Sequence, residues 1–359
     1  AKSSVTDRIM VRDKKKINAM EKIMIPPLDS NAAEVIKNNW AKMDKPLHSL
    51  GKLEEMVEKY AAMTGTALPD KIKSAMLLMC GDHGIAKYGV SAYPQEVTMQ
   101  MINGYMRETA GANVMARHAG ADVFVIDAGT AFDLSAMPKV HQEKVAWGTE
   151  DFTQGPAMTV EQAEKALKVG MKVADECIDK GYNLLVTAEM GIGNTTSTAA
   201  IVSAFLGLPP EFTVGRGTGI NDERMAIKRK VVADGLAKNQ PRLGDAMDIL
   251  CKVGGYDHAG LAGMILAGAR RRIPTMVDGV NATAAALLAY GLEPACADYM
   301  LCSHLSAEIS HAKMLEVLRL TPIVDAGMRL GEGTGASLAI VILQMAINTY
   351  KELYKCGGM

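Results

Sequence analysis

The chain has 359 residues, of which 48% are hydrophobic and 22% are charged, and its formal net charge is −1 at pH 7. A chain without a basic excess has no overall charge that attracts nucleic acid. It contains no apolar run of membrane-spanning length and shows no secretion signal at its start. We therefore expect a cytoplasmic protein with neither a nucleic-acid nor a membrane partner, long enough to bury a sizeable core.

Basic clusters and cysteines add two expectations. The richest basic cluster, residues 12–16, is expected to be a solvated arm and not a binding patch. The cysteines are scattered and form no CxxC pair, which predicts reduced thiols and neither a disulfide framework nor a zinc site. They are Cys80, Cys177, Cys251, Cys296, Cys302 and Cys356.

In chain order, two helices are predicted first, at 31–43 and 53–63. Short apolar runs that end in polar or glycine-rich loops predict strands at 73–80, 122–127, 183–187, 274–278 and 298–303. Helices are predicted at 95–107, 160–180, 195–205, 222–237, 258–272, 282–290, 306–318 and 336–354, with an irregular connection at 132–156. Strands that alternate with helices predict an α/β fold with a doubly wound, mainly parallel sheet. Ligands of such a sheet bind beyond the carboxyl ends of its strands.

Glycine-rich loops are the strongest chemical signal in the sequence. The stretch 328–337 has glycine at every second position around Glu332 and leads into a predicted helix. Such a loop points free N–H groups at a ligand and favours an anion. Glu332 then has two interpretations: a first-turn carboxylate that complements the helix dipole, or a general base beside a phosphate-binding loop. Similar loops at 187–196, which carries Glu189, and at 215–219 suggest an anionic ligand held at several points.

Other binding chemistries fit the sequence less well. After Gly335 the chain lacks room for the second strand and acidic residue of a dinucleotide-binding unit, and there is no P-loop motif. His83 and His304 lie in loops without metal-ligand spacing, so no metal site is expected. Lys228 and Arg224, four residues apart on a helix, fit either a solvated basic face or a phosphate clamp.

Six segments in chain order carry a resemblance to a known family. They are GDHG at 81–84 with GVSAYPQEVT at 89–98, EMGIGNTT at 189–196, GGYD at 254–257, VDG at 277–279, SHLSAE at 303–308 and RLGEGTGA at 329–336. Together they closely resemble the nicotinate-nucleotide:dimethylbenzimidazole phosphoribosyltransferase family, which makes the lower nucleotide of cobamides. The resemblance extends over nearly the whole chain from about Pro46 onward.

The resemblance implies transfer of the 5-phosphoribosyl group of nicotinate mononucleotide to a cobamide lower-ligand base, without a cofactor. Glu332 matches the family's general base, and Glu189 matches a second active-site carboxylate. The positions that hold phosphate and ribose are matched by Gly191, Ile192, Asn194, Gly215, Gly217, Lys228 and Ser306. The resemblance also implies a dimer. Each subunit would have a large α/β domain at about 66–335 and a small helical domain made of residues 1–65 and about 336–359.

The expected acceptor pocket departs from the benzimidazole-specific members of the family. Its positions are occupied by Tyr93, Met101 and Met190, which are bulky. This filling resembles the alpha subunit of the phenol-activating branch, a heterodimer of two homologous subunits that attaches phenol or p-cresol. Alternatives are neutral drift in an ordinary dimethylbenzimidazole enzyme, the non-catalytic partner subunit of a heterodimer, and an NAD-dependent oxidoreductase.

Overall fold

The computed structural model describes residues 23–65 and 68–353 of the chain. The basic cluster at 12–16, Cys356 and the last residue of the predicted helix 336–354 lie outside these residues. The centre of the fold is one six-stranded parallel sheet with the strand order β3-β2-β1-β4-β5-β6. Its strands are β1 (Ser74–Gly81), β2 (Ala121–Gly129), β3 (Val140–Gln142), β4 (Leu184–Met190), β5 (Thr275–Val277) and β6 (Met300–Cys302).

The order of the strands reverses between β1 and β4. The chain builds outward from β1 through β2 to β3, then returns to the other side of β1 and builds outward again from β4. This confirms the predicted doubly wound parallel sheet. In such sheets the crevice for a ligand opens beyond the carboxyl ends of the two strands at the reversal. Glu189 is the next-to-last residue of β4 and therefore lies at this crevice.

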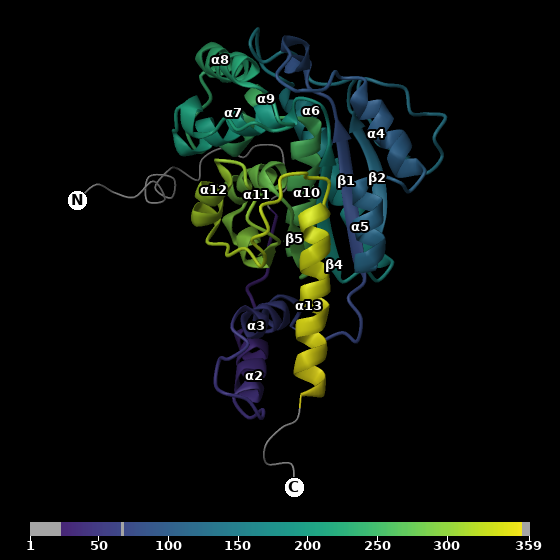
Figure 1. The fold of residues 1–359 in the computed structure, drawn as a ribbon, viewed down its shortest axis with the longest axis vertical. Helices are drawn as coiled ribbons and strands as arrows, with labels where there is room; N and C mark the ends of the chain where they lie inside the picture. Colours follow the sequence, from purple (N-terminus) through teal and green to yellow (C-terminus); the bar gives the residue numbers. More distant parts are fainter. Residues whose placement is uncertain (1–22, 66–67, 354–359) are drawn as a thin grey trace, which may run out of the picture.

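Helices cover both faces of the sheet, which explains why every residue of β1 and β4 is buried. Helices α6 (Val160–Asp179) and α10 (Tyr256–Arg270) pack on one face, and α5 (Gly111–Ala119) and α13 (Thr334–Glu352) on the other (Figure 1). On β1, the side chain of Met79 meets α10, whereas that of Met76 meets the start of α13. Residues three positions apart in a strand point to opposite faces, so the two helix layers lie on opposite sides.

The two ends of the described chain meet in a small group of helices. Helices α2 (Ser30–Trp40) and α3 (Lys52–Thr64) lie beside the C-terminal half of α13 (Figure 1). The Asn39 side chain donates a hydrogen bond of 2.7 Å to the Tyr350 hydroxyl, and the Trp40 and Tyr350 rings meet edge to face at 5.0 Å. Helix α13 therefore runs from the glycine-rich loop at its start to this helical group. The predicted domain boundaries near 65 and 336 stay a prediction.

The remaining helices surround the sheet and its carboxyl end. They are η1 (Gly84–Tyr88), α4 (Val97–Met106), α7 (Asn194–Leu206), η2 (Pro210–Phe212), α8 (Asp222–Asn239), α9 (Ala246–Val253), α11 (Val280–Leu292), η3 (Pro294–Tyr299) and α12 (His311–Leu318). In the described part of the chain, no helix has the length and apolar character needed to cross a membrane.

Several predicted elements differ from the structure. Helix α5 was not predicted from the sequence, and strand β3 lies within the connection predicted to be irregular. The helix predicted at 306–318 begins only at His311, because residues before it form a loop fixed by side-chain hydrogen bonds. The strand predicted at 298–303 is shortened to Met300–Cys302 by the turn η3, which has proline at its first position.

Candidate active site

The loop before α13 has an unusual backbone. Gly331, Glu332 and Gly333 have φ values of 81°, 59° and 76°, so three successive residues are in the left-handed region. Glutamate seldom adopts this conformation, which costs on the order of 1 kcal/mol or more and persists only where the surroundings impose it. Here Asp278 imposes it, because its carboxylate accepts N–H groups of Gly333 at 3.1 Å and Ala336 at 2.9 Å.

Close packing explains why glycines alternate in this loop. A Cβ atom on Gly331 would lie 2.5 Å from Oε1 of Glu189, and one on Gly335 would lie 2.0 Å from Nδ1 of His304. A Cβ atom on Gly333 would lie 2.8 Å from the sulfur of Met76 on β1. The glycines therefore let the loop that carries Glu332 approach Met76 within β1 and Glu189 near the carboxyl end of β4.

Glu189 and Glu332 are brought together by this approach. The Glu332 N–H donates to Oε1 of Glu189 at 3.4 Å, and the Asn194 side chain donates to the other oxygen of Glu189. The pKa of Glu189 is raised to about 8, chiefly by burial and then by the negative charges of Asp257 and Asp278, while a hydrogen bond from Asn281 opposes them. Glu189 is therefore mostly protonated at pH 7.

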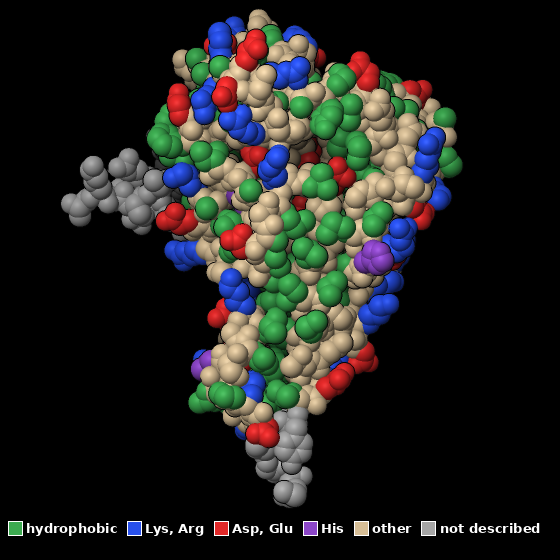
Figure 2. Space-filling model, viewed as in Figure 1, with side chains coloured by type: hydrophobic (Ala, Val, Ile, Leu, Met, Phe, Trp, Pro, Cys, Tyr) green, Lys and Arg blue, Asp and Glu red, His purple; other side chains and the backbone are tan. Residues whose placement is uncertain are grey.

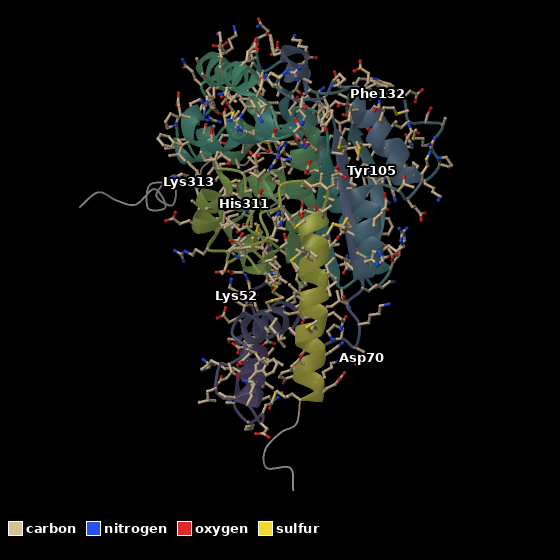
Figure 3. All side chains as sticks on the ribbon, in the orientation of Figure 1. Lys52, Asp70, Tyr105, Phe132, His311 and Lys313 are labelled. Atoms are coloured by element: carbon tan, nitrogen blue, oxygen red, sulfur yellow. The ribbon has the colours of Figure 1, made fainter. Side chains whose placement is uncertain are left out.

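Glu332 is also buried, and its pKa is raised. Burial is the main cause, and the nearby Asp278 charge adds to it, while the Tyr105 phenol and the Ala112 N–H act in the opposite direction. Ala112 lies in the first turn of α5, and Tyr105 lies on α4 (Figure 3). Neither Oε2 of Glu332 nor the Tyr105 hydroxyl has a hydrogen-bond partner of good geometry among the described residues. An unsatisfied buried carboxylate oxygen is suited to accept a proton from a bound molecule.

Lys228 occupies a buried pocket of opposite charge. It lies on α8, is fully buried, and donates to Oγ1 of Thr195 at 2.8 Å and to the Gly215 carbonyl at 3.2 Å. Burial lowers its pKa to about 8, although the Glu308 carboxylate acts to raise it. Glu308 also accepts the Gly217 N–H at 2.9 Å. The alternative of a solvated basic face is therefore wrong for Lys228.

The acidic and basic parts of the site share the start of α7. Asn194 contacts Glu189, and Thr195, the next residue, contacts Lys228. Neighbouring Cα atoms lie about 3.8 Å apart, so a single peptide unit connects the two parts. Such a site presents carboxyl groups to one portion of a ligand and an ammonium group to an adjacent portion.

Two of the residues predicted to bind phosphate and ribose have structural roles. A Cβ atom on Gly191 would lie 1.8 Å from the Gly81 carbonyl oxygen, so glycine is required where β4 passes β1. The Ile192 N–H donates to Oγ1 of Thr98 at 3.1 Å and is thereby engaged within the protein. Ser306 lies close to the Lys228 pocket, because its hydroxyl accepts the Glu308 N–H at 3.4 Å.

The residues predicted to line an acceptor pocket come from three segments. Met190 ends β4 beside Glu189 and is buried, whereas Met101 lies on α4, one helical turn after Thr98. Since Thr98 binds the N–H of residue 192, this turn of α4 runs past the end of β4. Tyr93 lies in the segment before α4 and is 54% exposed. The N–H of the preceding residue donates to Thr218, which ties this segment to the loop at 215–219.

One buried carboxylate and two buried imidazoles form a further cluster, which includes His83 shortly after β1. Asp257 faces Nε2 of His83 at 3.2 Å and Nδ1 of His258 at 3.1 Å, and the candidate ligand atoms of all three lie within 4.8 Å of one another. Burial would raise the pKa of Asp257, but the two imidazoles lower it well below its usual range. The three side chains could hold a cation. Of the two imidazoles, that of His83 forms a hydrogen bond of 3.3 Å to Asp257 through Nε2, whereas Nδ1 of His258 has no hydrogen-bond partner of good geometry among the described residues. The expected absence of a metal stays a prediction.

Sequence reasoning missed several groups that shape the site. Asp278 and Glu308 belong to recognised segments but had no assigned role, and Tyr105, Thr195 and the first turn of α5 were not considered. Asp278 follows directly on β5. This position at the carboxyl end of a strand was the available signal.

Comparisons with known proteins agree with this geometry. A family model described as phosphoribosyltransferase matches residues 25–357. The nicotinate-nucleotide–dimethylbenzimidazole phosphoribosyltransferase of Chloroflexus aggregans is 46% identical over 329 residues, which cover 92% of this chain and 93% of that protein. The protein of that name from Geobacter sulfurreducens is 46% identical over 332 residues, covering 92% and 94%. The crystal structure of CobT from Thermus thermophilus superposes with a TM-score of 0.86 at 40% identity, covering 90% of this chain and 97% of that one.

Proposed function

The chain belongs to the phosphoribosyltransferase family, and we propose that it transfers the 5-phosphoribosyl group of nicotinate mononucleotide to a cobamide lower-ligand base. The products are nicotinate and an α-riboside 5′-phosphate. The donor is a substrate, and no cofactor is required by this reaction. The relatives named above are dimethylbenzimidazole enzymes. We extend the proposed acceptors of this chain to phenol and p-cresol.

One observation carries the proposal of phosphoribosyl transfer. The carboxyl pair Glu189 and Glu332 and the ammonium of Lys228 lie on either side of the adjacent residues Asn194 and Thr195. A ribose 5′-phosphate needs this combination. Its phosphate takes the ammonium, and its C1′ atom takes carboxylates that stabilise a cation-like transition state.

The proposed reaction breaks the C1′–N bond to nicotinate and forms a bond from C1′ to the acceptor atom. Glu332 accepts the proton that the acceptor loses, since its raised pKa and free Oε2 suit a general base. Glu189 is mostly neutral before substrate binds, and positive charge at C1′ favours its ionised form. Lys228 holds the 5′-phosphate of both the donor and the product.

The phenolic acceptor rests on Tyr93, Met101 and Met190. Methionine side chains adapt to a ligand and offer apolar, polarizable walls, and tyrosine adds an aromatic body with a hydroxyl tip. The turn of α4 that carries Met101 passes the end of β4, where Met190 lies next to Glu189. A single six-membered ring would fill this place more closely than a fused bicycle.

The direct test incubates the purified chain with nicotinate mononucleotide and one acceptor at a time. Nicotinate release and the riboside phosphate are measured by chromatography with mass detection. We expect product with dimethylbenzimidazole, phenol and p-cresol. If no acceptor releases nicotinate, either alone or with a homologous partner subunit added, the proposal of phosphoribosyl transfer is wrong.

We also propose that a homologous subunit covers an apolar face along α13, in a heterodimer or a homodimer. Val341 and Met345 on α13 are 44% and 57% exposed, and Val114 on α5 is 36% exposed. Figure 2 shows hydrophobic side chains gathered over these helices. Light scattering of the parent and of Met345→Glu tests this face. A dimer that persists unchanged in the variant would place the interface elsewhere.

The compartment is proposed as cytoplasmic. The five described cysteines are free and buried, which agrees with a reducing environment. Labelling the intact cell and its fractions with an antibody to the chain would test this proposal. Recovery with membranes or outside the cell would contradict it.

A further inference from the structure

The Glu308 carboxylate lies inside the Lys228 pocket. Its Oε1 accepts the Gly217 N–H at 2.9 Å, and its charge is the one that opposes the lowering of the Lys228 pKa. A Cβ atom on Gly215 would lie 1.7 Å from its Oε2. Glycine at position 215 therefore leaves the space that the Glu308 carboxylate occupies.

These contacts are those of a bound anion. A backbone N–H, a glycine that permits close approach and a buried ammonium are the groups that commonly hold a phosphate. Here the Gly217 N–H and the space left by Gly215 hold the carboxylate of Glu308, near enough to Lys228 for its charge to act on the ammonium. The Ser306 hydroxyl, also expected at the phosphate, accepts the Glu308 N–H at 3.4 Å. Three of the residues predicted to bind phosphate, Gly215, Gly217 and Lys228, thus lie around this carboxylate, and the fourth, Ser306, binds the backbone N–H of the same residue.

An empty site would leave Lys228 without a counter-charge. A buried charge that lacks a partner is strongly destabilising, commonly by several kcal/mol. Glu308 supplies the partner from a loop whose backbone is fixed elsewhere. The N–H of Leu305 binds the Val324 carbonyl at 2.8 Å, and that of Ala307 binds the Met328 carbonyl at 3.0 Å. The side chain of Glu308 is only half-buried, so it can turn outward while this backbone stays in place.

We propose that Glu308 is an internal counter-anion of the phosphate subsite, which the 5′-phosphate of a substrate displaces. This inference rests on the proposed function for the identity of the phosphate ligand. The donor and the product carry the same phosphate group, so a competing carboxylate weakens the binding of both. Glu308 thereby lowers the affinity for the donor and speeds release of the product.

Glu308→Gln tests the inference directly. The amide oxygen of glutamine can still accept the Gly217 N–H, so the loop is retained while the negative charge is lost. Binding of inorganic phosphate and of nicotinate mononucleotide is measured by calorimetry at pH 6.5, below the Lys228 pKa of about 8. We expect the Kd for both to fall by about 10-fold, which corresponds to about 1.4 kcal/mol. Equal or weaker binding in the variant would overturn the proposal.

Two further variants serve as a control and as a second measurement of phosphate binding. Glu316→Gln removes the same charge from an exposed position of α12 and should leave both Kd values unchanged. Glu308→Ala, with thermal unfolding as a check on the fold, gives a second measurement in case the glutamine variant does not fold. It should also bind inorganic phosphate more tightly than the parent.

The inference and the proposed function can fail separately. If the parent transfers phosphoribosyl groups but Glu308→Gln shows an unchanged or higher KM for nicotinate mononucleotide, the counter-anion proposal is wrong and the function stands. If the parent releases no nicotinate but Glu308→Gln binds inorganic phosphate more tightly, the function is wrong and the counter-anion stands.

Discussion

The site has two buried parts: the carboxyl groups of Glu189 and Glu332, called the carboxyl cluster, and the surroundings of Lys228, called the lysine pocket. They differ in whether a group of opposite charge lies nearby. Burial raises the pKa of Glu189 and Glu332 and lowers that of Lys228, so each group is pushed toward its neutral form. Lys228 has a carboxylate in its own pocket. Among the described residues, the groups that act most strongly on the two glutamates are acidic or neutral.

This difference indicates which charged group of a ligand each part of the site would bind. The lysine pocket contains an internal carboxylate, and we expect a bound phosphate to replace it. The carboxyl cluster has an excess of negative charge that Asp278 increases, and a cation-like sugar would relieve it. Variants that alter only one of the two parts should therefore affect chemistry or donor binding, but not both.

Glu332→Gln should have the largest effect on the carboxyl cluster. The amide retains the shape of the side chain but accepts no proton, so we expect kcat to fall by about 10²- to 10⁴-fold with the fold intact. Steady-state nicotinate release measures the fall in kcat, and circular dichroism checks that the fold is intact. Glu316→Gln, an exposed glutamate of α12, is the matched control. Turnover within a few-fold of the parent would remove Glu332 from the role of general base.

Lys228→Ala should affect donor binding selectively. The proposed charge-assisted contact of Lys228 to the phosphate would be worth about 1.5–3 kcal/mol, so its loss should raise the KM for nicotinate mononucleotide by about 10- to 100-fold. The KM for the acceptor should change little. Lys230→Ala on the same helix, where Lys230 pairs with Asp234 at the surface, is the control. Equal effects on both substrates would contradict a phosphate contact.

The pH dependence of stability sharpens the electrostatic side of the comparison. Glu189 has a pKa of about 8 in the folded chain and an ordinary value of 4.5, so between these values the folded state retains a proton that the unfolded state loses. The free energy of unfolding should therefore fall as pH rises from about 4.5 to 8, by up to about 1.4 kcal/mol per pH unit from this group.

Glu189→Gln should flatten this part of the stability curve. Glutamine does not titrate, so only the contribution of other groups, including Glu332, remains. Urea unfolding at pH 5, 6, 7 and 8 measures the slope in parent and variant. Equal slopes would mean that Glu189 does not titrate in this range.

The sheet was predictable from sequence because its central strands are buried on both faces. A continuous apolar run followed by a polar loop, as in β1 and β4, reflects helices on both sides. Strand β3 has three residues and a mixed burial pattern, which leaves no comparable signal. Helix α5 begins after Ala110, which offers no side-chain cap, so its start was not marked.

The site was predictable in its residues more than in its electrostatics. Glu332 was identified from its flanking glycines, but the groups that set its pKa were not. The Ala112 N–H at the start of α5, a helix that was not predicted, acts to lower this pKa, and burial outweighs it. The Glu308 contact with Gly217 joins segments 91 residues apart, and no local pattern in either segment encodes such a pairing.

The smallest predicted effect concerns the choice of acceptor. A phenol has a pKa of about 10, so it is neutral at pH 7 and must lose its proton as the bond to C1′ forms. Dimethylbenzimidazole attacks with a free lone pair and depends less on a base at that moment. The loss caused by Glu332→Gln should therefore be greater with phenol than with dimethylbenzimidazole, which product analysis with each acceptor would measure.

Met101→Ala tests the shape of the acceptor pocket itself. Shortening this side chain makes room for a second ring, and differences of one or two methylene groups in an apolar pocket are worth about 1–3 kcal/mol. We expect kcat/KM for dimethylbenzimidazole relative to phenol to rise by about 10-fold, whereas Met24→Ala, at a position that is 76% exposed, should leave the ratio unchanged. A parent enzyme that makes product only from benzimidazoles, with a ratio insensitive to Met101, would show that Tyr93, Met101 and Met190 do not select phenols. In that case the difference between the carboxyl cluster and the lysine pocket would still hold, because neither depends on which base attacks C1′.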